Sequence, residues 1–161
     1  MPTRFVFDFE WDKVSRGNRR DNDGKIDVLI LNVGHPPTLL INRTPTANNA
    51  VLLKLIGTKS NKAAIGARAT VSAGDLVQFS EVRAGSSYLS QNDLRLHFGL
   101  GQKTTIDTVE ISWPSGKKDV LKNLPANFIY TIVEAEGIRQ KTPLATSSPE
   151  SPRNRETTPR R

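Results

Sequence analysis

Short apolar runs separated by glycine and small polar residues constrain this chain more than any other feature. Strands are expected near residues 50–56, 66–73, 76–84, 94–98, 105–113, 117–121 and 127–135. Within residues 105–113, polar and apolar side chains alternate, which is the period of a strand with one buried face. No window has a helical period. Frequent short strands with glycine turns predict an all-β fold, either a β-sandwich or a partly open barrel.

The region before these runs is expected to add a small hairpin. Residues 3–11 predict a short strand, because phenylalanines alternate with acidic residues there. A polar loop at 21–27 leads into the apolar run 28–33, a turn, and a return strand at 38–42. The expected divisions are an unassigned segment (1–20), a partial repeat (21–46), a β domain (47–137) and a disordered basic tail (138–161).

The net charge of +7 at pH 7 lies at the two ends of the chain. Residues 21–137 carry 12 basic and 11 acidic side chains, so the body is close to neutral. The tail is rich in Ser, Thr, Pro and Arg and cannot offset its ordering entropy, which predicts disorder. Its arginines predict at best weak, salt-sensitive and nonspecific contact with nucleic acid, and specific binding is not expected. These residues are Arg153, Arg155, Arg160 and Arg161.

The absence of several sequence features excludes some classes of protein and of site. The chain has no cysteine, so neither a disulfide framework nor a thiolate metal site can form. No run approaches the roughly 18 apolar residues that a membrane-spanning helix needs. The N-terminus has a strand pattern in place of the apolar core of a signal peptide.

Four motifs occur in order along the β domain, and together they are far more specific than any one alone. They are Ser-Asn-x-x-Ala-Ile-Gly-Ala at 60–67, Leu-Ser-Gln at 89–91, His-Phe-Gly-Leu-Gly at 97–101 and Trp-Pro-Ser-Gly at 113–116. Over residues 49–135 the chain resembles the ASPIC/UnbV domain, which is found at the C-terminus of cartilage acidic protein and of many bacterial exported proteins. The resemblance implies an extracytoplasmic, non-catalytic accessory or adhesion-type module that contacts a protein or a glycan.

The resemblance also implies a set of signature residues that we expect to be mostly structural. Asn61, Ser87 and Gln91 are expected to tie turns to strands, and the glycines to set bends. For Trp113, a core anchor is favoured over a sugar-stacking surface shared with Tyr88. The set comprises Ser60, Asn61, Gly66, Ser87, Gln91, His97, Gly99, Trp113 and Gly116.

Upstream, residues 21–43 resemble the end of an FG-GAP (VCBS-type) repeat, the blade unit of a β-propeller that commonly precedes this domain. This resemblance implies propeller repeats of a longer parent protein as partners. The calcium loop of such repeats, Asp-x-Asp-x-Asp-Gly-x-x-Asp, places Asp21, Asp23 and Asp27 on ligand positions, and the Lys25 carbonyl supplies another oxygen. Arg19 stands where the first aspartate belongs, and its charge repels a cation. A weak Ca²⁺ site and a metal-free turn closed by hydrogen bonds both stay open.

Catalysis is not expected from these residues. A hydroxyl nucleophile needs a neighbouring histidine, and the chain has only His35, in a proline-rich turn, and His97, in a strand where half-burial is expected. The serines of residues 86–90 are expected to satisfy backbone groups in turns. Glu134 and Glu136 share a strand face and are expected to be solvated edge charges. Only the UnbV half of the family name suggests an accessory role in a biosynthetic pathway.

Overall fold

The computed structural model describes residues 6–8, 22–31, 38–85 and 93–145. Every regular element in these residues is a strand. A small antiparallel sheet contains β1 (Val6–Asp8), β2 (Val28–Leu31) and β3 (Thr38–Leu40), in that order. The β domain contains β4 (Asn49–Ile56), β5 (Arg68–Ala73), β6 (Leu76–Glu81), β7 (Leu96–Gly101), β8 (Thr105–Ser112), β9 (Lys118–Pro125), β10 (Phe128–Val133) and β11 (Gly137–Pro143).

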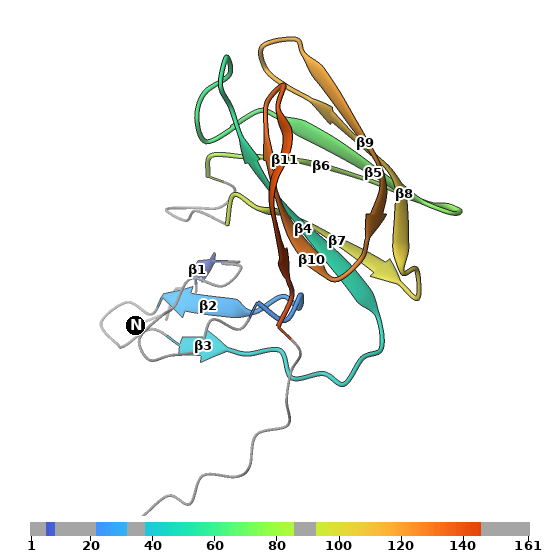
Figure 1. Cartoon of the computed structure of the whole chain (residues 1–161). Helices are drawn as coiled ribbons and strands as arrows, with labels where there is room; N and C mark the ends of the chain where they lie inside the picture. The colour runs from blue at the N-terminus through green and yellow to red at the C-terminus, as the bar shows by residue number, and fades with distance from the viewer. Residues whose placement is uncertain (1–5, 9–21, 32–37, 86–92, 146–161) are drawn as a thin grey trace, which may run out of the picture.

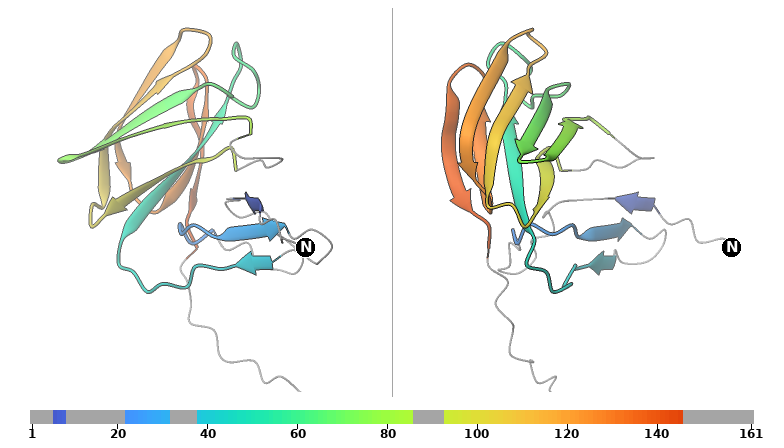
Figure 2. Two further views of the ribbon diagram at one scale, coloured as in Figure 1. Left: turned by 180° about the vertical axis from the view of Figure 1, so that it is seen from behind. Right: turned by 90° about the vertical axis from the view of Figure 1, so that its right-hand side faces the viewer.

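Two four-stranded sheets form the β domain and pack as two layers, with the small sheet at one end (Figure 1, Figure 2). Their strand orders are β11-β10-β4-β7 and β6-β5-β8-β9. Neighbouring strands are antiparallel, apart from the parallel pair β4 and β10. In the described part of the chain no ladder joins the edges of the two sheets, so the barrel is not closed. The expected all-β sandwich is confirmed.

The core fills the space between the two layers because alternate residues of each strand point inward. Val51 and Leu53 of β4 are fully buried there. Val109 and Ile111 of β8 are likewise buried. The largest fully buried side chain is Tyr130, whose hydroxyl donates to the Pro125 carbonyl at 2.8 Å. The core is therefore mainly aliphatic with a few aromatic anchors.

One expected boundary is wrong, because residues 137–143 form β11 in place of the start of a disordered tail. This strand exposes most of its side chains, so its sequence has no apolar alternation. Backbone pairing with β10 holds it, and the Lys141 ammonium lies 3.9 Å from the centroid of the Phe128 ring. Residues 146–161, the rest of the expected tail, lie outside the described residues.

Removing β11 should destabilise the β domain. A chain that ends at Glu136 loses the ladder to β10 and the backbone bond from Leu144 N–H to the Asn127 carbonyl. We expect the free energy of unfolding to fall by at least about 2 kcal/mol, since each net hydrogen bond contributes roughly 1 kcal/mol. Urea denaturation measures the change, with a chain ending at Ala145 as the control. Equal stability of the two truncations would contradict this role for β11.

Candidate functional site

A buried carboxylate joins three separate parts of the motif-bearing region. Glu134 follows the end of β10 and is 1% exposed. Its Oε2 accepts hydrogen bonds from the backbone N–H groups of Thr58, Lys59 and Ser60, each at 2.8 Å. Its Oε1 accepts from the Ser60 hydroxyl at 3.0 Å and from the Ser115 hydroxyl. The carboxylate thus fixes the loop after β4 and the Trp-Pro-Ser-Gly turn to one point.

Local geometry shapes the loop that surrounds this carboxylate. A Cβ atom on Gly57 would lie 2.2 Å from the Asn61 carbonyl oxygen, so no larger residue fits there. The Asn61 side chain accepts from the Ile65 N–H at 2.9 Å and donates to the Ile65 carbonyl at 2.8 Å. Asn61 thus closes the loop upon itself through Ile65, whereas the expectation was that it ties a turn to a strand.

Hydrogen bonding determines the protonation state of Glu134. Burial raises its pKa, but hydrogen bonds from the Ser115 hydroxyl and from the Ser60 and Thr58 amides outweigh burial and lower the pKa to about 2. The group is therefore ionised at neutral pH and is a poor proton acceptor. The expectation that Glu134 is a solvated edge charge is wrong, because three consecutive loop amides need an acceptor and Glu134 supplies it. Glu136, in contrast, is exposed and pairs with Arg139 at 2.7 Å.

Trp113 anchors the end of β8 in the core. Its side chain is 3% exposed, and its indole N–H donates to Asp119 Oδ2 at 2.7 Å. The same oxygen accepts from the Ala135 N–H at 3.0 Å, which ties the turn after β10 to β9. Trp113 is a core residue, as expected, and offers no surface for a sugar.

The remaining signature positions lie in turns, in strand β7 or outside the described residues. Gly66 and Gly116 occupy turns with φ values of 89° and 85°. Gly99 is exposed within β7, and a Cβ there would meet nothing within 4 Å, so no packing reason for glycine is found. Ser87 and Gln91 lie outside the described residues, as do His35, Tyr88 and Arg19.

The described aspartates of the expected calcium loop make local hydrogen bonds. Asp23 Oδ1 accepts from the Lys25 N–H at 2.9 Å, and Asp23 Oδ2 lies 3.3 Å from the Lys25 ammonium. Asp27 is buried, and its Oδ1 accepts from the Asn42 N–H at 2.7 Å, which joins the loop to the end of β3. Asp21 lies outside the described residues, and the residues described contain no group of three metal-ligand side chains. The Lys25 ammonium beside Asp23 fits a cation poorly, so calcium binding stays a prediction.

Residues 22–24 of the same loop are fixed onto the outer side of the sheet that contains β4 and β7. His97 of β7 donates through Nε2 to the Gly24 carbonyl at 2.8 Å. Arg95 donates to Asn22 Oδ1 at 2.8 Å, and the Ala145 N–H donates to the Asn22 carbonyl at 2.7 Å. Burial lowers the pKa of His97, while its bond to Gly24 opposes that shift. The expectation of a half-buried, hydrogen-bonded His97 is confirmed.

Apolar contacts accompany these hydrogen bonds. A Cβ on Gly24 would lie 2.8 Å from Leu144 Cδ1 and 3.4 Å from the Ala50 methyl, so the loop backbone packs directly on the domain. Ala50 and Leu52 alternate along β4 with the core residues Val51 and Leu53, so their side chains lie on the outer face of the strand. They are nevertheless only 8% and 3% exposed. Both faces of β4 are therefore covered at this end, which explains the apolar run at residues 50–53.

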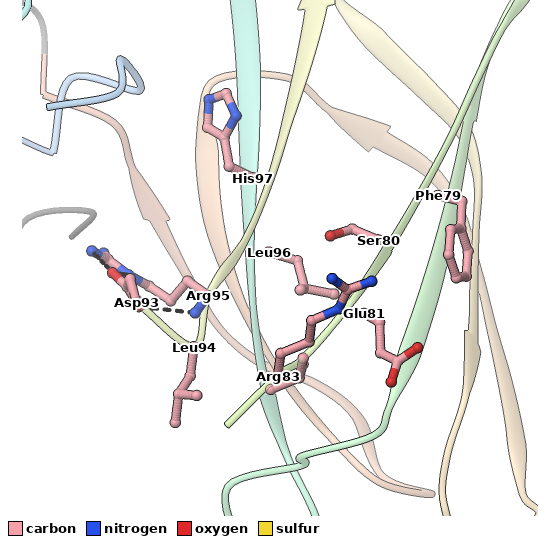
Figure 3. A pocket seen from close by; sticks show the side chains of 10 residues that line it. Phe79, Ser80, Glu81, Arg83, Asp93, Leu94, Arg95, Leu96 and His97 are labelled. Atoms are coloured by element: carbon pink, nitrogen blue, oxygen red, sulfur yellow. Dashed lines mark hydrogen bonds and ion pairs between the residues drawn. The ribbon is translucent and has the colours of Figure 1, made fainter. Parts of the chain in front are cut away.

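A cavity of about 370 Å³ lies between the end of β6 and the start of β7. Its lining combines charged residues with a hydroxyl and aliphatic side chains. Figure 3 shows Asp93 and Arg95 bonded to each other on one side and Arg83 on the other. The charged lining residues are Glu81, Arg83, Asp93 and Arg95. Sequence motifs did not reveal this cavity, because its walls belong to two strands that are not paired with each other.

The acid sensitivity of the domain should depend on Glu134. Because its pKa is lower in the folded chain than in the unfolded chain, its contribution to stability is present above about pH 4.5 and is lost as pH falls toward 2. Glu134→Gln should lower the free energy of unfolding most at neutral pH, and the difference from wild type should shrink between pH 4.5 and pH 2. Urea denaturation across this pH range checks the trend.

Glu136→Gln is the matched control, since that carboxylate lies two residues away and is exposed. It should change the pH dependence little. A Glu134→Gln variant as stable as wild type at pH 7 would show that the carboxylate does not hold the three segments together.

Comparison with known proteins gives one family assignment. The model of the ASPIC and UnbV family matches residues 57–139, which include the loop after β4, the cavity and Glu134. No curated protein matches the chain. Among the described residues, no helix is long and apolar enough to cross a membrane. The match covers half of the sequence, and the chain therefore belongs to the ASPIC and UnbV family.

Proposed function

We propose that this chain is a non-catalytic, extracytoplasmic accessory module that holds a propeller-type repeat on the outer face of its β4–β7 sheet and mediates protein or glycan contacts. The observation that carries the proposal is the attachment of the loop at 22–24 to His97, Arg95 and Ala145. The loop that resembles the end of an FG-GAP repeat is thereby a fixed part of the module. The resemblance to exported proteins supports the extracytoplasmic location.

The chemistry of the described polar groups supports a role without bond-making. The hydroxyls of Ser60 and Ser115 both donate to Glu134, whose low pKa makes it a poor general base. His97 uses Nε2 to hold the Gly24 carbonyl, so that nitrogen does not face a hydroxyl nucleophile. The hydrogen bonds of these groups hold loops in place, which supports a structural role for them.

Partner binding explains why the module keeps exposed apolar side chains. Leu39, Leu40 and Ile41 lie at and beside the edge strand β3 and are each at least 41% exposed. An edge strand with apolar side chains is suited to pairing with a neighbouring sheet. Such pairing fits a further blade of a propeller in the parent protein, which we propose as the partner.

Blocking the contact at Gly24 should release the loop from the domain. Gly24→Val places a branched side chain against both Leu144 and Ala50, so trypsin should cleave after Lys25 faster than in wild type, at least about tenfold if roughly 1.4 kcal/mol of docking is lost. Gly116→Val is the control, because Gly116 has a similar φ but no atom within 4 Å of the added Cβ. Equal cleavage of both variants would contradict the proposed attachment.

A glycan array read by mass spectrometry tests the activity of the full chain. We expect retention of a subset of glycans with unchanged masses. If no glycan on the array is retained, the proposal is restricted to protein contacts. Cleaved or modified glycans would overturn the non-catalytic role.

A further inference from the structure

The outer face of the sheet β6-β5-β8-β9 carries the three most exposed large apolar side chains among the described residues. Val77 and Phe79 of β6 are 65% and 61% exposed, and Val120 of β9 is 53% exposed. Each alternates with residues that point toward the core, and in Figure 3 Phe79 points away from the side of β6 on which Ser80 lies. The described part of the chain therefore leaves these side chains open to solvent on one surface.

The strand registers arrange this outer face in three rows that run across the sheet. Each row takes one residue from each strand, in the order β6, β5, β8 and β9. The first row has an acidic and a basic end, the second has two apolar ends, and the third has an apolar and a basic end. The rows are Glu81, Arg68, Ser112 and Lys118; Phe79, Thr70, Glu110 and Val120; and Val77, Ser72, Thr108 and Lys122.

A second copy of the same face complements these rows when the two-fold axis runs parallel to the strands. Such an axis keeps each row opposite itself and places β6 of one copy over β9 of the other. Phe79 of one copy then faces Val120 of the other, and Glu81 faces Lys118. Each contact occurs twice, because a two-fold interface uses the same surface on both copies. Apolar groups thus meet apolar groups, and opposite charges meet.

Charge disfavours the other way of stacking two copies of this face. Sheets that pack face to face in an aligned sandwich keep their strands within about 30° of each other, so the remaining axis is the one perpendicular to the strands. That axis places β9 over β9 with the rows reversed, so Lys118 faces Lys122 and Glu110 faces Glu110. Like charges opposed across an interface suppress an arrangement. The pattern of side chains therefore selects one of the two stackings.

We propose that this face binds a second copy of the chain, with aligned strands and β6 over β9. The outer faces of the two layers point in opposite directions, so the dimer leaves the loop at 22–24 free to carry its neighbour (Figure 2). The face covers roughly 300 Å² in plan, from a strand spacing of about 4.8 Å and a rise of about 3.4 Å per residue. This area is small beside the roughly 800 Å² per partner of a standard interface, so we expect a dissociation constant on the order of 10–100 µM.

Sedimentation equilibrium of the full chain, between about 1 µM and about 1 mM, measures the dimer. Phe79→Ser should weaken it at least about tenfold, because aromatic anchors carry much of the energy of an interface. Added salt should also weaken it, since two of its contacts are ion pairs. Lys54→Glu is the control: it reverses an exposed charge on β4, in the other sheet, and should leave the dimer unchanged.

Two single charge reversals test the pairing of the copies. Lys118→Glu opposes two carboxylates at both contacts of its own dimer, and Glu81→Lys opposes two ammonium groups. Each variant alone should therefore be monomeric where wild type dimerises. In an equimolar mixture, a dimer with one copy of each variant has two attractive contacts, so dimerisation should return. Effects within one chain, such as the contact of position 81 with Arg68, are the same in the mixture as in each variant alone.

Three results would overturn the proposal: a monomer at about 1 mM, a dimer that Phe79→Ser leaves unchanged, or a mixture no more dimeric than its two components. A wild-type monomer that loses a retained glycan on Phe79→Ser would assign the face to a glycan, and would also overturn it. None of these results bears on the attachment of the loop, because Gly24 and Leu144 pack on the other sheet.

Discussion

The hydrogen bonding of the buried Glu134 carboxylate is the interaction on which the arrangement of the two sheets depends. A charge removed from water is costly unless its partners replace the lost hydration, and here three amides and two hydroxyls do so. The dependence is mutual, because the amides after β4 need an acceptor as much as the carboxylate needs donors. The Glu134 N–H also donates to the Ile56 carbonyl at 2.9 Å, so backbone and side chain hold the same corner.

A second constraint is the burial of both faces of β4. The inner face packs in the sandwich core through Val51 and Leu53, and the outer face is covered at Ala50 by Gly24 and Leu144. The loop before the domain is therefore a structural part of it. This arrangement supports the proposed role of the chain as a module that carries a neighbouring β element. A polar cavity lies elsewhere, between the end of β6 and the start of β7.

Sequence patterns predicted the parts of the structure that are governed by local periodicity. The strands of the sandwich, the core position of Trp113 and the half-buried His97 follow from alternation and motif spacing. Three features do not follow from such local patterns. β11 has exposed charged residues such as Arg139 and Lys141, so only its pairing with β10 reveals it. Glu134 follows an apolar strand, and its partners all lie earlier in the sequence, Ser60 by 74 residues and Ser115 by 19. The cavity likewise depends on two unpaired strands that no local pattern brings together.

Amide hydrogen exchange of two adjacent residues tests most directly whether the loop at 22–24 is part of the module. The Leu144 N–H donates to Asn127 within the β domain, whereas the Ala145 N–H donates to the Asn22 carbonyl of the loop. If the loop is held on the domain, both amides exchange slowly, with comparable protection. Protection at Leu144 together with exchange of Ala145 at the rate of an unfolded chain would show that the domain folds without holding the loop.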